Sequence, residues 1–471
     1  MAVLLCVLTA ALGFAAEGPK LVNPKRVFPK GDPVYKRPTQ YHAWAMRLSP
    51  DGKHVLYSRP KPGQTLDPAD FKSWQNVTYE LVLRELATGK DTLLPLGPVE
   101  SGWQTVYTRF NVFDPTGARL LLLTRDVTPV RAKPSRADAG GRRTGASGYS
   151  ARATTRVFLY DVAAGKLAPT KIEGPRAFAK FDRTGAGLVG VMADMKSRTM
   201  RLYTAGPTGQ NVRLLKAQGF PQSVCPTADV LCVWAPPKGT RGRGLQSMLE
   251  ALRKQREFLT KQVADHPENA TNLQPQIDAL DRRMKDTEAR ARAAEAEYRP
   301  QRLTLYDLAA DKEIAELPVH ERNSALDDIE TQWTPDGRYL YYHDVEPFMR
   351  DTVEGPKERL RQLSRIWDRI AGKPANVVKE TRPVGPGPAP STMVLAVRTN
   401  PEPGEERPGG FFLHDARTGK QYPLGDDTMY LIHAWGKRVL YAKKAPDGTE
   451  AVYLAEIDMG RGKTITVFSD T

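Results

Sequence analysis

The chain has 471 residues, of which 40% are hydrophobic, so it can bury a sizeable core and is not a disordered chain overall. The length suits either two or three ordinary domains or one large all-β ring. The formal net charge of +15 at pH 7 favours anionic partners without identifying one.

The first 16 residues carry no charged side chain, and the apolar run from Val3 to Leu8 precedes the small-residue stretch from Gly13 to Ala16. This pattern predicts a signal peptide over 1–16 and an exported protein, periplasmic or extracellular. Because no Lys or Arg precedes the run, a poorly ordered apolar N-terminus or a misassigned start stays open. No other stretch approaches the length of a membrane-spanning helix, so none is expected.

A short turn phrase recurs along the chain. Its clearest copies are Leu48 to Lys53 and Thr334 to Arg338, and weaker copies are Asp114 to Arg119 and Asp182 to Ala186. In the clear copies Pro presets the first turn position, Asp caps the turn, and Gly accepts the positive φ that reverses a strand. Apolar residues follow the turn, so each copy predicts a β-hairpin.

A second phrase alternates with the first. It is a strand that in most copies ends in an aromatic or acidic pair, and in its complete copies a Gly-Lys turn follows. The copies are Leu83 to Lys90, Phe158 to Lys166, Leu305 to Leu308, Ile366 to Lys373 and Leu413 to Lys420. Two hairpins together make a four-stranded antiparallel sheet, which is the unit of a propeller blade.

The alternation predicts an all-β fold, a seven-bladed β-propeller over 42–468, preceded by an N-terminal extension over 17–41. The first-hairpin turns are expected near Pro50, Pro115, Thr184, Thr227, Pro335, Ser391 and Gly436. The copies at Thr227, Ser391 and Gly436 are degenerate, so six or eight blades also remain compatible with the pattern.

The turn from Ser49 to Lys53 resembles that of the TolB-like and prolyl-oligopeptidase-type (WD40-like) β-propellers, and the resemblance extends from about His42 to Phe468. It implies the fold. In that family the ring is a binding platform in some members and a gate over a hydrolase in others. The nucleophile motif Gly-x-Ser-x-Gly of the hydrolase does not occur in this sequence, so the resemblance does not extend to peptidase activity.

Long insertions interrupt four blades between their second and third strands: Arg59 to Thr78, Arg125 to Thr155, Pro236 to Arg299 and Asp344 to Ser364. Strands alternate in direction, so all of these insertions emerge on one side of the ring, which we call the insertion face. The opposite side, the turn face, carries only tight turns. Binding residues tend to lie on loops held by a rigid scaffold, so the insertion face is the candidate functional surface.

The insertion of blade two contains a basic stretch with the single acid Asp138. Its candidate residues for binding an anionic partner are Arg131, Lys133, Arg136, Arg142, Arg143, Arg152 and Arg156. The stretch is glycine-rich and lacks an apolar period, which predicts a mobile loop that either is simply solvated or binds anionic lipid or acidic polymer. Aromatic residues are nearly absent, so no specific nucleic-acid binding is expected.

The insertion of blade four predicts a helical hairpin over 240–299. Its expected apolar seams are Leu245, Met248, Leu252, Gln255 and Leu259 on the first helix, and Leu273, Ile277, Leu280, Met284, Thr287, Ala291, Ala294 and Tyr298 on the second. Either the two seams pack against each other, or the hairpin contacts a partner or dimerises with a second copy.

No catalytic, metal-binding or cofactor-binding motif is found, and no cofactor is expected. His414 replaces an aromatic residue of other blades, which predicts a packing role. Cys225 and Cys232 are read as small buried residues, with a disulfide left open. The sequence therefore favours a non-catalytic scaffold for a protein, peptide or envelope polymer. The alternatives are an enzyme with a site in the channel and a partner of a separately encoded hydrolase.

Overall fold

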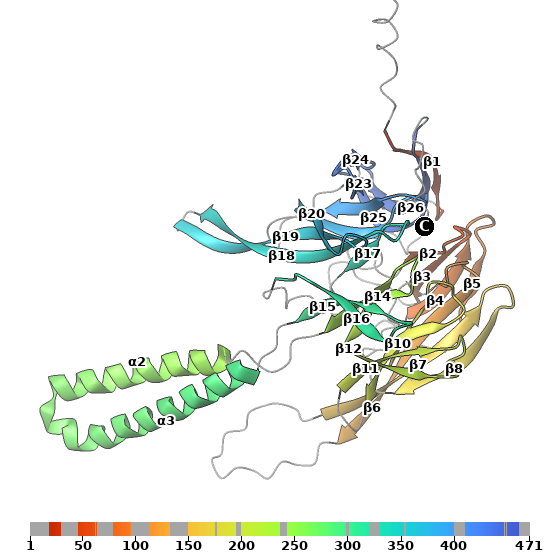
Figure 1. Cartoon of the computed structure of the whole chain (residues 1–471). Coiled ribbons are helices and arrows are strands. Elements are labelled where there is room, and N and C mark those ends of the chain that lie inside the picture. The colour runs from red at the N-terminus through yellow and green to blue at the C-terminus, as the bar shows by residue number, and fades with distance from the viewer. Residues whose placement is uncertain are drawn as a thin grey trace, which may run out of the picture. The chain divides into compact units, whose positions relative to one another are not determined.

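The computed structural model describes residues 18–29, 46–61, 63, 79–95, 113–131, 149–174, 177–194, 199–235, 243–297, 301–320, 330–352, 355–399, 410–446, 448 and 450–460. The predicted signal peptide lies outside these residues. The chain forms a seven-bladed β-propeller with an inserted helical hairpin, as the sequence predicted (Figure 1).

Strands run outward from the centre in each blade. Blade one comprises β2 (Arg47–Leu48), β3 (His54–Pro60), β4 (Tyr79–Glu85) and β5 (Asp91–Leu93). Blade two comprises β6 (Arg119–Arg131), β7 (Tyr149–Asp161) and β8 (Lys166–Gly174). Blade three comprises β9 (Phe178–Phe181), β10 (Leu188–Asp194), β11 (Thr199–Ala205) and β12 (Arg213–Gln218). In blade two an isolated bridge between Phe113 and Leu120 stands in place of the inner strand.

The remaining blades repeat the arrangement. Blade four comprises β13 (Phe220–Val224), β14 (Val230–Ala235), β15 (Arg302–Asp307) and β16 (Lys312–Leu317). Blade five comprises β17 (Thr331–Trp333), β18 (Tyr339–Thr352), β19 (Gly355–Asp368) and β20 (Lys373–Lys379). Blade six comprises β21 (Thr381–Pro386), β22 (Met393–Arg398), β23 (Phe411–Asp415) and β24 (Gln421–Pro423). Blade seven comprises β25 (Met429–Trp435), β26 (Arg438–Lys444), β27 (Glu450–Asp458) and β1 (Lys20–Arg26).

The first-hairpin turns fall where the turn phrase placed them. In blade one, Ser49 Oγ donates to Asp51 Oδ1 at 2.6 Å, and the Lys53 amide donates to the same oxygen at 3.0 Å. Gly52 has φ of 66° and its counterpart Gly337 has φ of 69°, which L-residues with a side chain rarely adopt. Side-chain capping therefore shapes the turn of blade one, and a glycine of positive φ completes the turns of blades one and five.

The N-terminal segment closes the ring, which the sequence reading missed. β1 lies within 17–41, the segment expected to be an extension, and pairs antiparallel with β27 from Lys20↔Asp458 to Arg26↔Tyr453. Blade seven therefore combines three strands from the end of the chain with one from its beginning.

Two insertions expected as loops contain long β-hairpins. β6 and β7 pair as far as Arg131↔Tyr149, and β18 and β19 pair as far as Thr352↔Gly355. The expectation of loops over Arg125 to Thr155 and Asp344 to Ser364 is wrong to that extent. Most of the insertion from Arg59 to Thr78 lies outside the described residues.

The inserted hairpin belongs to a second compact unit. It consists of α2 (Arg243–Asp265), a short η4 turn (Pro267–Asn269) and α3 (Ala270–Glu297). Leu252 and Leu259 pack against Ile277 and Leu280, which confirms that the two seams pack on each other. The seam of α2 differs in register from the expectation, because Met248 is 38% exposed and Leu249 is buried in its place, and Gln255 is exposed.

The hydrophobic core lies mainly between neighbouring blades. One cluster joins Leu48 and Val55 of blade one to Leu440 and Val452 of blade seven, and similar clusters fill other seams. Cys225 and Cys232 are buried and free, so they act as small core residues and form no disulfide. Each blade is thus stabilised by its neighbours.

Candidate binding face

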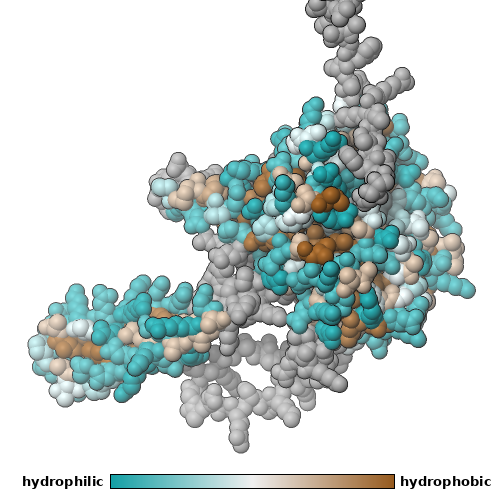
Figure 2. All heavy atoms as spheres, viewed as in Figure 1, coloured by the Kyte–Doolittle hydropathy of each residue, from teal (hydrophilic) through white to brown (hydrophobic). Residues whose placement is uncertain are grey.

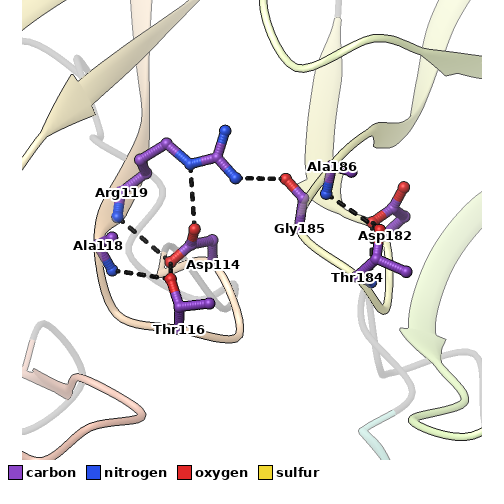
Figure 3. A network of polar contacts seen from close by, with 8 residues as sticks. All are labelled: Asp114, Thr116, Ala118, Arg119, Asp182, Thr184, Gly185 and Ala186. Atoms are coloured by element: carbon purple, nitrogen blue, oxygen red, sulfur yellow. Dashed lines mark hydrogen bonds and ion pairs between the residues drawn. The ribbon is translucent and has the colours of Figure 1, made fainter.

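On the turn face, polar groups are engaged in contacts between blades. Arg119 Nε lies 3.0 Å from Asp114 Oδ2 within blade two, and Arg119 Nη2 donates to the carbonyl of Gly185 in blade three at 2.6 Å (Figure 3). Asp114 is 1% exposed, so this ion pair is largely withdrawn from water. The arginine holds two neighbouring turns together.

Comparable contacts join four other pairs of blades on this face. They are Arg183 to Asp229 at 2.7 Å, Thr227 Oγ1 to the Asp336 carbonyl at 3.3 Å, the Asp336 amide to the Ser391 carbonyl at 3.4 Å, and Arg438 Nη1 to the Asp51 carbonyl at 2.5 Å. The turn face therefore contributes hydrogen bonds and ion pairs that join neighbouring blades.

On the insertion face, the β18–β19 arm extends beyond its blade. β17 pairs with β18 only up to Tyr342, and β20 pairs with β19 only from Leu363 onward. From Glu346↔Arg361 to their end, the two strands pair with no other strand among the residues that the structure describes. At about 3.3 Å per residue, this part of the arm is about 20 Å long.

The two sides of the β18–β19 arm differ in chemistry. On one side Arg361 lies 2.9 Å from Glu346, and its guanidinium lies 5.0 Å from the centre of the Phe348 ring. On the other side Met349 is 63% exposed and Leu360 is 38% exposed. The arm therefore presents both charge and apolar surface.

Three of the seven predicted basic residues lie in the other arm, which is formed by β6 and β7. Arg131 ends β6, and Arg152 and Arg156 lie in β7 opposite Thr128 and Thr124. The prediction of a mobile loop from Arg131 to Arg156 is therefore wrong at both ends. Arg156 is 55% exposed and lies 3.9 Å from Glu173. The other four predicted positions, Lys133, Arg136, Arg142 and Arg143, lie outside the described residues.

The inner strands carry basic residues that the sequence reading did not single out. Among the described residues of these strands and the position just before β17, the charged ones are Arg47, Lys180, Arg382 and Glu330. Arg382 lies 3.1 Å from Glu330, and Lys180 donates to the backbone carbonyl of Gln222 in the next blade. The inner wall is therefore net positive where it is described. Aligning the first strand of each blade would have revealed it.

Three histidines lie in different strands of their blades: His433 in the inner strand β25, His343 in the second strand β18 and His414 in the third strand β23. By exposed area His343 and His414 are buried and His433 is half-buried. Burial lowers the pKa of His343 and of His414 to about 4 and that of His433 to about 3. His414 packs edge-on against Tyr341 with ring centres 5.6 Å apart, and its Nδ1 lies 2.7 Å from the tyrosine hydroxyl. The predicted packing role of His414 is confirmed. At neutral pH all three are uncharged.

Among the described residues, no group of three or more His, Cys, Asp or Glu side chains is placed to hold a metal ion. No helix in the described part of the chain is long and apolar enough to cross a membrane. In the view of Figure 2, hydrophilic residues cover most of the described surface, and hydrophobic areas are small and separate.

No protein-family model and no curated protein matches the sequence. Solved structures with a similar chain path include the β-propeller domain of the Trilobed protease from Pyrococcus furiosus, at 9% identity, TM-score 0.42, over 94% of this chain and 97% of that one. The tricorn protease matches at 10% identity, TM-score 0.45, over 96% of this chain and 36% of that one. An acylaminoacyl peptidase matches at 10% identity, TM-score 0.40, over 89% and 51%.

Proposed function

We propose that this ring is a non-catalytic scaffold that binds its partner on the insertion face. The observation that carries the proposal is the difference between the two faces. Turn-face groups such as Arg119 and Arg438 are committed to contacts between blades, whereas the insertion face bears the β6–β7 and β18–β19 arms. Projections on a rigid ring suit recognition of a large partner.

We propose further that the partner is anionic, an acidic protein or polymer. The chain carries a net charge of +15, and the stretch from Arg131 to Arg156 carries seven basic residues against one acid. The inner wall adds Arg47, Lys180 and Arg382. Binding of this kind falls as salt rises, because the Debye length shrinks from about 10 Å at 0.1 M to about 3 Å at 1 M.

Co-sedimentation with poly-glutamate immobilised on beads tests both proposals. The test variant replaces Arg136, Arg142, Arg143 and Arg152 with Ser, and anionic vesicles of phosphatidylglycerol serve as a second probe. A control variant of equal charge replaces four exposed lysines near the turn face with Ser: Lys90, Lys166, Lys373 and Lys420. We expect the test variant alone to bind weakly. Equal binding by both variants would refute the assignment to the insertion face.

We propose that the protein is exported and that its signal peptide is removed. The apolar residues from Val3 to Leu8 and the small residues up to Ala16 support this. Mass spectrometry of the protein purified from its own cells should find an N-terminus at Ala16 or Glu17. An intact N-terminus would contradict the proposal.

A further inference from the structure

Phe28, two residues beyond β1, is buried at the seam between the first and last blades. Its side chain is 3% exposed and packs in one cluster with Val55 and Tyr57 of blade one and Leu440 and Val452 of blade seven. The ring of Phe28 meets that of Tyr57 edge-on with centres 5.3 Å apart. A single aromatic side chain from the N-terminal segment therefore fills the seam where the ring closes.

Arg84 of blade one packs against the ring of Phe28. Its guanidinium lies 4.4 Å above the centre of the Phe28 ring, and its Nη1 donates to the carbonyl of Val27 at 3.2 Å. Two further hydrogen bonds, at 2.7 and 2.8 Å, fix the guanidinium to Asp91. Tyr57 donates its hydroxyl to Asp91 at 2.9 Å. Blade one thus contributes a cation–π contact and a hydrogen bond to the backbone of the N-terminal segment.

The strand before Phe28 is held less firmly. Most side chains of β1 are exposed, and its register with β27 shifts between Val22 and Lys25 around Asn23, which has φ of 53°. As the outermost strand of its blade, β1 buries little apolar surface. Terminal strands of this kind open locally more readily than strands inside a sheet.

The link from β1 to the first blade is long. β20 and β21, which belong to consecutive blades, are joined by Glu380 alone, whereas 18 residues separate the bound Phe28 from Arg47. A chain of about 18 residues spans up to about 60 Å when extended. The connection therefore does not force β1 to pair with its own β27.

We propose that the edge of β27 and the space between Arg84 and Tyr57, where Phe28 packs, form a binding site for an extended strand with an aromatic side chain. The N-terminal segment of a second copy of this chain binds there. The firm anchor at Phe28, the weakly packed strand before it and the long link are the features that permit such an exchange. Two copies that exchange β1 would form a closed pair without any new interface.

Disulfide trapping between full-length copies tests the exchange. Val22 and Glu456 lie opposite each other in the antiparallel pair, partly or fully exposed, at a separation that a disulfide spans. One tagged copy carries Val22→Cys, and a second copy with a different tag carries Glu456→Cys. Cys6 is replaced with Ser in both copies, and the native Cys225 and Cys232 are fully buried and should not react. After mixing, mild oxidation should yield a covalent pair that carries both tags.

The matched control moves the second cysteine to Lys373→Cys, an exposed position in blade five. A labelled peptide of residues 18–29 with Val22→Cys provides a second measurement on the full-length Glu456→Cys protein. Adding Phe28→Ala to the peptide removes a core aromatic side chain and should lower its crosslinking by about a hundredfold. Trapping no greater than in the Lys373→Cys control, or equal crosslinking by both peptides, would overturn the proposal.

Discussion

The backbone amide of Leu48 donates a hydrogen bond to Nδ1 of His433 across 3.3 Å, which joins the inner strand of the first blade to that of the last. An imidazole nitrogen can accept this bond only when it carries no proton. Protonation of His433 therefore removes a contact that holds the ring closed.

The free energy of unfolding should fall as the pH drops below the unfolded-state pKa of histidine. His343, His414 and His433 have folded-state pKa values of about 4, 4 and 3, below the 6.5 expected when unfolded. The unfolded chain thus binds more protons, so the contribution of the three histidines is complete above pH 6.5 and is lost as the pH falls to about 3. Three protons correspond to a slope of up to about 4 kcal/mol per pH unit. Urea unfolding at several pH values measures this slope of the free energy of unfolding with pH.

His414→Gln should reduce this slope by about a third, because one of the three protons no longer binds on unfolding. The unchanged protein is the reference. Equal slopes for the two proteins would show that His414 does not contribute to the acid sensitivity.

Phe28→Ala should destabilise the ring by about 3 to 5 kcal/mol, because it leaves a cavity at the seam between blades one and seven. Phe258→Ala is the control, since Phe258 is 59% exposed on the hairpin and should cost less than about 0.5 kcal/mol. Thermal unfolding compares the two. Similar melting temperatures would contradict the role given to Phe28.

Arg119→Met should cost about 2 to 3 kcal/mol, because the carboxylate of Asp114 stays buried without its cation and Gly185 loses a donor. Arg183→Met provides a contrast, since the pair of Arg183 with Asp229 is 36% and 54% exposed and should contribute at most about 1 kcal/mol. Chemical denaturation of both variants tests whether burial distinguishes these contacts.

Deleting Gly239 to Arg299 and joining the ends with a short Gly-Ser linker should leave the ring folded. The helices bury Leu252 and Ile277 against each other, so their core is their own. A single cooperative thermal transition is expected. Its loss would show that the hairpin is part of the folding core of the ring.

The turn chemistry of the blades could be read from the sequence, because Pro-Asp-Gly and Gly-Lys phrases act locally. β1 was missed because Asn23 and Pro24 interrupt its alternation and its side chains are mostly exposed. The β6–β7 arm was predicted as a loop because its sequence is rich in glycine and lacks an apolar period. Pro129 and Pro347 also interrupt the strand pattern of the two arms. The contact of Arg119 with Gly185 depends on how two blades pack, which no local pattern encodes.

Hydrogen–deuterium exchange with and without poly-glutamate tests most directly whether the partner occupies the insertion face. We expect slower exchange in the β6–β7 and β18–β19 arms, and unchanged exchange at the turns around Gly52 and Gly337. Protection of those turns with unprotected arms would contradict the account.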